Sequence, residues 1–329
     1  MTPADRVLAR VRAVAGPGAI VEAYGSSGYA PDHASEVDIL VSGDEPDRIA
    51  AALGLTRIYT QPPHMHGKLE GRDVDITVVN GDDDRAERMR SGPRDAAAIA
   101  GYLRTHARDA AFQAAWPHVR QFVRARALGH NGLGWFGSFG WALLLAIPLV
   151  TDDDMRAVAP GAAFPAWVRW LAKLSPGARV GFDATRAGEE EAFFLVAPSP
   201  PTRDVARLSR KAATAFFAEA RAALVAIGDT STDGEAMARI KDIALEPPPG
   251  ATLVIAGTEE HSRGRYDGQA RGLLRELEQL CTTRSWGRFD TDEDGSWQHR
   301  ITVAAPKRKA ARELAQRWLA LANIDAEVD

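Results

Sequence analysis

The sequence has very little cysteine. Cys281 is the single cysteine among 329 residues, which excludes an intramolecular disulfide and any zinc site built on several cysteines. A chain without disulfides is typical of a reducing compartment, so we expect a cytoplasmic protein. The first residues contain no basic stretch followed by an apolar run, and a secretory signal peptide is not expected.

Net charge and lysine are also scarce. The 40 basic and 44 acidic residues leave a net charge of −4, so no strong overall field attracts nucleic acid. Six of the basic residues are lysine, and the excess of arginine suits bidentate contacts with phosphate. A GC-rich coding sequence would produce the same bias.

Long apolar runs are limited to one segment. Residues 133–150 carry no charge, and eighteen such residues reach the lower length limit of a membrane span. Several glycines and Pro148 interrupt the segment. The sequence therefore favours a buried helix in a protein core, and no membrane association is expected.

The N-terminal part shows a mixed α/β pattern. We expect a helix that starts at Thr2-Pro3 and ends at Gly16, and a hairpin that turns at Glu70-Gly71. The pattern further predicts strands at 19–24, 36–41 and 56–60, a helix at 46–53, and the two hairpin strands within 68–79.

The rest of the chain divides at a proline-rich linker, residues 246–250. Before the linker, helix is expected over residues 95–150, 164–174 and 203–227. After it, the order is strand, helix, strand, strand, helix, strand: 251–256, 268–280, 287–291, 298–304, 307–322 and 324–328. This βαββαβ order is that of the ferredoxin-like or RRM-like plait.

Acidic residues alternate with apolar ones in two of the expected strands. Val37, Ile39 and Val41 face a core, so Glu36 and Asp38 lie side by side on the opposite face. Asp75 alternates in the same way with Val74 and Ile76. If the two strands are neighbours, three carboxylates meet and can hold two Mg²⁺ (or Mn²⁺) ions about 3.5–4 Å apart.

A glycine-serine turn precedes the acidic pair. Gly25 lets the backbone approach a phosphate, backbone N–H groups at a strand-to-helix turn bind it, and the Ser26 hydroxyl can donate to it. Each feature alone is ordinary, because acidic strands are common on solvated sheet faces. The ordered combination of turn, acidic pair and later acidic strand is far more specific for phosphoryl transfer.

This arrangement resembles the DNA polymerase β-like nucleotidyltransferase superfamily, and within it eukaryotic-type poly(A) polymerase, here in a compact and bacterial-like version. Further likeness comes from 131–142 (NGLGWFGSFGWA), 91–95 (SGPRD), 197–201 (APSPP) with Asp204-Val205, and 266–278. The resemblance covers nearly the whole chain in the same domain order. It departs from the family at Glu36, where most members have aspartate, and at Gly129, where a base-stacking tyrosine is usual; Trp135 could replace that tyrosine or belong to the core.

The resemblance implies roles for particular residues. Glu36, Asp38 and Asp75 would be the catalytic metal ligands. The nucleotide would contact the phosphate turn and four further positions in the central part: Gly25, Ser26, Arg120, Asn131, Gly137 and Ser138.

The resemblance also implies a three-domain α+β organisation. A mixed-sheet nucleotidyltransferase domain would span 1–90, a helical central domain 91–244, and an RRM-like C-terminal plait 250–329. The expected reaction is Mg²⁺-dependent, template-independent transfer of NMP from an NTP, favouring ATP, to an RNA 3′ end. Nothing in the sequence indicates oligomerisation, so a monomer is favoured.

Other interpretations stay open. The same site could make cyclic or short oligonucleotides as second messengers, or the chain could be a noncatalytic RNA-binding module or modify a small molecule or protein. Arg124 and Arg126 lie near Arg120 and could bind a triphosphate or face solvent. His64 and His66 show no third ligand, and we expect them to be surface residues.

Overall fold

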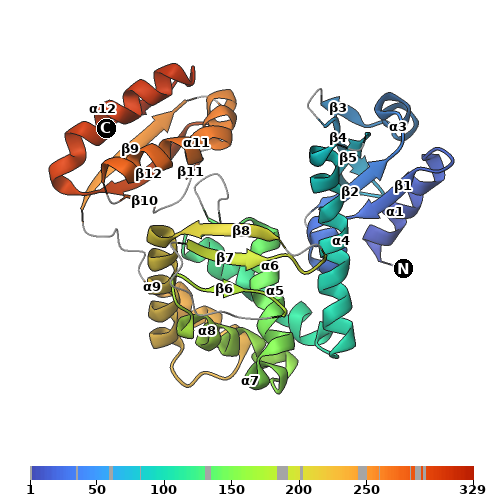
Figure 1. Ribbon diagram of the computed structural model, residues 1–329, viewed down its shortest axis with the longest axis horizontal. Helices are drawn as coiled ribbons and strands as arrows, with labels where there is room; N and C mark the ends of the chain where they lie inside the picture. The colour runs from blue at the N-terminus through green and yellow to red at the C-terminus, as the bar shows by residue number, and fades with distance from the viewer. Residues whose placement is uncertain are drawn as a thin grey trace.

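The computed structural model describes most of the chain: residues 2–34, 36–58, 62–81, 83–129, 135–183, 192–200, 203–243, 250–258, 260–281, 283–285, 290–291 and 294–329. Figure 1 shows a mixed α+β protein in three successive parts. An N-terminal sheet with its helices and a C-terminal sheet with its helices lie on the same side of a mainly helical middle part.

The N-terminal part is built on a mixed five-stranded sheet, as expected. The strands follow the order β1-β2-β5-β4-β3, in which β2 and β5 pair in parallel and the other pairs are antiparallel. Their bounds are β1 Ile20–Ala23, β2 Glu36–Ser42, β3 Thr56–Ile58, β4 His64–Leu69 and β5 Arg72–Val79. The hairpin turn between β4 and β5 has positive φ at Glu70 and Gly71.

Two helices cover one face of this sheet. Helix α1 (Pro3–Val14) begins at a capping box in which Thr2 and Asp5 satisfy each other's backbone N–H groups. Helix α3 (Pro46–Leu53) ends at Gly54, whose φ is +67°. Both helices pack apolar side chains on Val37, Ile39 and the other inward residues of β2 and β5. The opposite face is left for the acidic residues.

That opposite face meets a short helix, α2 (Gly25–Tyr29), and the long helix α4 (Asp84–Thr105), while the turn η1 (Pro31–His33) follows α2 and contacts both α2 and α1. The domain boundary expected between residues 90 and 91 falls inside α4. One continuous helix therefore joins the N-terminal sheet to the middle part.

The middle part is mainly helical around a buried core. Its helices are α5 Asp109–Ala125, α6 Ser138–Thr151, α7 Asp153–Arg156, α8 Ala163–Lys173, α9 Arg210–Ile227 and α10 Asp233–Lys241, with the turn η3 Pro160–Ala162. Residues 140–150 of α6 are all buried, as the uncharged segment predicts. None of the described helices is long and apolar enough to cross a bilayer.

The middle part also contains a small sheet that the sequence analysis did not predict. Strands β6 (Arg179–Val180), β7 (Ala192–Val196) and β8 (Asp204–Ser209) follow one another in it, with β8 at one edge. The helix expected over 203–227 begins only at Arg210. Residues 204–209 pair with β7 instead, because cross-strand packing overrides their local helical preference.

The C-terminal part is an antiparallel sheet with two helices packed on each other. Its path β10-β12-β9-β13 joins β9 Ala251–Gly257, β10 Thr283–Ser285, β12 Trp297–Val303 and β13 Glu327–Val328, and β11 Asp290–Thr291 pairs with β12. The helices are α11 Glu260–Leu280 and α12 Arg308–Leu321, the latter preceded by η4 Ala305–Lys307. Helix α11 starts earlier than expected, and β10 was not expected.

Candidate active site

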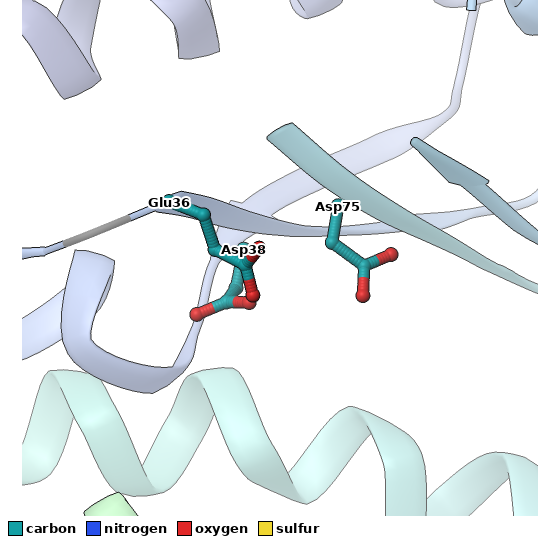
Figure 2. A group of neighbouring side chains, drawn as sticks. All are labelled: Glu36, Asp38 and Asp75. Carbon is teal, nitrogen blue, oxygen red and sulfur yellow. The ribbon is translucent and has the colours of Figure 1, made fainter. Parts of the chain in front are cut away.

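The three predicted carboxylates lie together on one face of the N-terminal sheet. The parallel register of β2 and β5 places Asp38 directly beside Asp75. Glu36 lies two residues earlier on β2 and so shares the face with Asp38. Carboxylate oxygens of all three lie within 4.8 Å of one another, and Figure 2 shows the side chains on the same side of the two strands.

The electrostatics of this cluster are unfavourable without a cation. Burial, together with the neighbouring charges of Glu36 and Asp75, raises the pKa of Asp38 to about 7. At neutral pH a proton or a positive ion is therefore needed beside Asp38. Oxygen-only ligands at this spacing suit a hard divalent cation such as Mg²⁺, and the donor set fits that ion.

Gly25 packs directly against the carboxylate of Asp38. Its φ is +56°, and a Cβ at this position would lie 2.5 Å from Asp38 Oδ2. Gly28, one turn later, would bring a Cβ to 2.7 Å from the Cβ of Ala96 in α4. Glycine is therefore required at both ends of α2, once against the acidic face of the sheet and once against the long helix.

The second serine of the turn holds α2 to β2. The hydroxyl of Ser27 donates to the carbonyl of Glu36 at 3.2 Å and accepts the N–H of Asp38 at 2.9 Å. Ser26, which the sequence analysis singled out, is half-buried and makes no described side-chain hydrogen bond. Ser27 thus fixes the backbone of β2, which carries two of the carboxylates. This role becomes visible only when α2 is seen to lie against β2.

His64 was expected at the surface, and its side chain is 30% exposed, but it also contacts the carboxylate cluster, which was not expected. Its Nδ1 lies 3.2 Å from Asp75 Oδ1 and 3.1 Å from the hydroxyl of Thr77. The Thr77 hydroxyl is in turn 3.1 Å from that of Tyr24. Strand β4 brings His64 across from Thr77, so the imidazole orients the third carboxylate. His66 is exposed, as expected.

Residues of the middle part approach the same end of the sheet. Arg120 on α5 donates to the carbonyl of His33 at 2.7 Å. Gly137 and Ser138 form the start of α6, where the ring of Phe139 lies 6.5 Å from that of Tyr29 in α2. The first turn of α6 is therefore close to the glycine-serine turn. Asn131 lies outside the described residues, and Trp135 is buried in the core.

Arg126 does not belong to this site. Its guanidinium is buried and donates to Glu219 at 2.7 and 2.9 Å and to the carbonyl of Ile243 at 2.9 Å. Because each nitrogen of this buried guanidinium donates to Glu219 or to the carbonyl of Ile243, Arg126 has a structural role. Arg124, two residues before it, is exposed.

No known protein family matches the sequence, and no curated protein does. Similar solved structures include the RNA terminal uridylyl transferase Cid1, at 14% identity, 71% of this chain, 90% of that chain and a TM-score of 0.47. A mutant of the Cid1 poly(U) polymerase bound to MgATP is 15% identical, and the match covers 70% of this chain and 89% of that chain with a TM-score of 0.48. A mutant of mtPAP in complex with ATPγS is 12% identical, and the match covers 70% of this chain and 64% of that chain with a TM-score of 0.44.

At such identities and TM-scores the likeness assigns no activity or substrate to this chain. The function must be argued from the geometry of the carboxylates and the turn beside them.

Proposed function

We propose that this protein is a template-independent nucleotidyltransferase that transfers NMP from an NTP to an RNA 3′ end. The observation that carries the proposal is the meeting of Glu36, Asp38 and Asp75 within 4.8 Å, with Gly25 packed on Asp38. The raised pKa of Asp38 makes the acidic cluster costly to the fold without a cation, and three carboxylates beside a glycine turn are a combination that suits phosphoryl transfer.

In the proposed reaction the acceptor hydroxyl oxygen bonds to the α-phosphorus as the bond to the β-phosphate oxygen breaks and pyrophosphate leaves. The hydroxyl proton passes to Asp75, which His64 holds in place. Glu36, Asp38 and Asp75 would hold Mg²⁺, and we propose two ions. When bound, the metal supplies positive charge to the transferring phosphate and to the leaving group.

The remaining contacts are proposed for the nucleotide. The N–H groups at the start of α2 and the Ser26 hydroxyl would bind the β- and γ-phosphates, because Gly25 lets the backbone come close. Arg120 would add a guanidinium on the opposite side, and Gly137, Ser138 and Asn131 would face the ribose and base. We propose ATP as the favoured nucleotide.

We further propose that the three parts act as catalytic, central and RNA-binding domains, over 1–90, 91–244 and 250–329. The C-terminal sheet path β10-β12-β9-β13 with α11 and α12 on each other supports an RRM-like plait. An RNA 3′ end is the acceptor that such a unit would present. No contact with a second copy of the chain is needed for the site.

The decisive experiment supplies each labelled NTP with Mg²⁺, with and without a single-stranded RNA. We expect RNA extension with ATP in the wild type and none with Asp38→Asn. Asp73→Asn is the matched control, since Asp73 is an exposed aspartate on the neighbouring strand β5 and its carboxylate lies 3.7 Å from Lys68 Nζ. Small products that form without RNA would replace the proposal by a second-messenger synthase, and activity retained in Asp38→Asn would overturn it.

A further inference from the structure

A groove lies where the middle part meets the C-terminal part. It has a volume of about 730 Å³ and lies between the end of β8, the first turn of α9 and helix α11. Arg207 and Arg210 come from the middle part, and Arg275 comes from α11. Three guanidinium groups from two parts of the chain therefore line one open groove.

These arginines are available to a ligand. All three are exposed, and none forms an ion pair with any described residue. Arg207 lies over the ring of Phe194, with 5.3 Å between the guanidinium carbon and the ring centroid. The acid in the groove, Glu278, accepts a hydrogen bond from Ser209 at 3.2 Å. The described lining of the groove holds three arginines and this one glutamate. The groove thus carries unbalanced positive charge.

Strand β8 connects this groove to the candidate active site. Just before its start, Arg203 binds Asp95 on α4, beside the Ala96 that contacts Gly28 of the glycine-serine turn. At its other end, Ser209 binds Glu278 of α11. As the edge strand of its sheet, β8 lies on the side of the middle part that faces the two other parts (Figure 1).

We propose that Arg207, Arg210 and Arg275 bind backbone phosphates of the acceptor RNA upstream of its 3′ end. The RNA would then run along β8. Guanidinium groups pair with phosphate oxygens in a bidentate manner regardless of base sequence. An acceptor whose end lies at the carboxylates and whose body reaches α11 would cross this groove. The inference rests on the proposed function, since it names the route of that acceptor.

The first test measures binding of a fluorescein-labelled single-stranded RNA of roughly 15 nucleotides by anisotropy over a range of salt concentrations. We expect the triple variant R207A/R210A/R275A to bind at least about tenfold more weakly. Its salt slope should fall by about 2, because each lost phosphate contact removes about 0.7. Arg317→Ala, an exposed arginine on α12 without a described ion pair, should change neither. Equal binding by the triple variant would overturn the inference.

The second test uses the single variants Arg275→Glu and Arg275→Lys, whose side chains lie on the surface of α11 and whose folding is checked by circular dichroism. Only the glutamate should raise the KM for the long RNA, and neither should change kcat for a dinucleotide acceptor that cannot reach the groove. An equal loss for both acceptors would contradict a remote phosphate site. A wild type that binds RNA but extends neither acceptor would overturn the proposed function, whereas the groove inference is judged on the binding data.

Discussion

The hydroxyl of Ser199 donates to the carboxylate of Asp95 over 2.5 Å, although 104 residues separate the two in the chain. Arg203 binds the other oxygen of the same carboxylate. Burial raises the pKa of Asp95, and the contacts with Ser199 and Arg203 act against that rise. The segment that enters the middle part is thereby fastened to the proline-rich segment that precedes β8.

Removal of this hydroxyl should weaken the fold measurably. We expect Ser199→Ala to lower the free energy of unfolding by about 1–3 kcal/mol, because the buried carboxylate of Asp95 loses one of its hydrogen-bond donors. Urea denaturation followed by tryptophan fluorescence measures the change. Ser231→Ala, an exposed serine without a described side-chain hydrogen bond, should stay within about 0.5 kcal/mol of the wild type.

Gly25→Ala should damage the site more than the fold. The added methyl group would lie 2.5 Å from Asp38 Oδ2, so the carboxylate must move away from its partners. We expect nucleotide incorporation to fall by about 100-fold or more, since misplacement by about 1 Å has such effects on catalysis. Gly18→Ala is the matched control: φ is also positive there, at +89°, but nothing lies within 4 Å. Equal losses in both variants would attribute the effect to backbone strain.

Asp38→Asn should stabilise the protein in a pH-dependent way. The pKa of Asp38 rises from 3.8 to about 7 on folding, so its ionised form is disfavoured in the folded state. The wild type therefore loses stability as the pH rises from about 4 to about 7, and the loss is complete above about 7. Without metal, we expect the variant to be more stable by on the order of 2 kcal/mol at pH ~8, because Asp38 keeps some contact with water, and by little at pH ~4. A variant that is less stable than the wild type at both pH values would contradict this account.

Mg²⁺ should raise the melting temperature of the wild type, because a ligand of the folded state alone stabilises it. Below about pH 7 the ion must displace the proton of Asp38. The increase should therefore be larger at pH ~8 than at pH ~6. Asp75→Asn should abolish the increase, while Asp73→Asn should retain it. Thermal scans with and without EDTA provide the measurement.

Arg126 offers a test of structure apart from catalysis. Replacement by methionine removes the buried guanidinium that pairs with the carboxylate of Glu219, and we expect a loss of about 3–5 kcal/mol in the free energy of unfolding. Arg124→Met, on an exposed position two residues away, should have little effect. If Arg126→Met instead folds normally and fails to bind nucleotide, the residue belongs to the site after all.

Local alternation was sufficient to predict which face of each strand is acidic. Val37 and Ile39 enter the core and Glu36 and Asp38 do not, as a period of two requires. Whether Asp75 joins them depends on which strands are neighbours in the sheet, and local alternation does not determine the order of the strands. The pairing of β2 with β5 brings Asp75 beside Asp38.

Features that depend on distant partners were missed for a common reason. His64 contacts Asp75 only because β4 folds back on β5, and Arg126 is buried only because Glu219 lies 93 residues further on. Residues 204–209 have no strand signal of their own until β7 pairs with them. In each case the deciding contact is tertiary, and no local pattern contains it.

The parallel pairing of β2 with β5 also determines where the chain tolerates insertions and deletions. Residues 43–55, which include α3, leave the sheet between β2 and β3, so the loops there can change in length without altering which residues of β2 and β5 face each other. One residue added within β2 would instead turn Glu36 and Asp38 into the core and bring Val37 and Ile39 out. Folding and chemistry would then fail together, so selection for a stable sheet also preserves the alignment of the carboxylates.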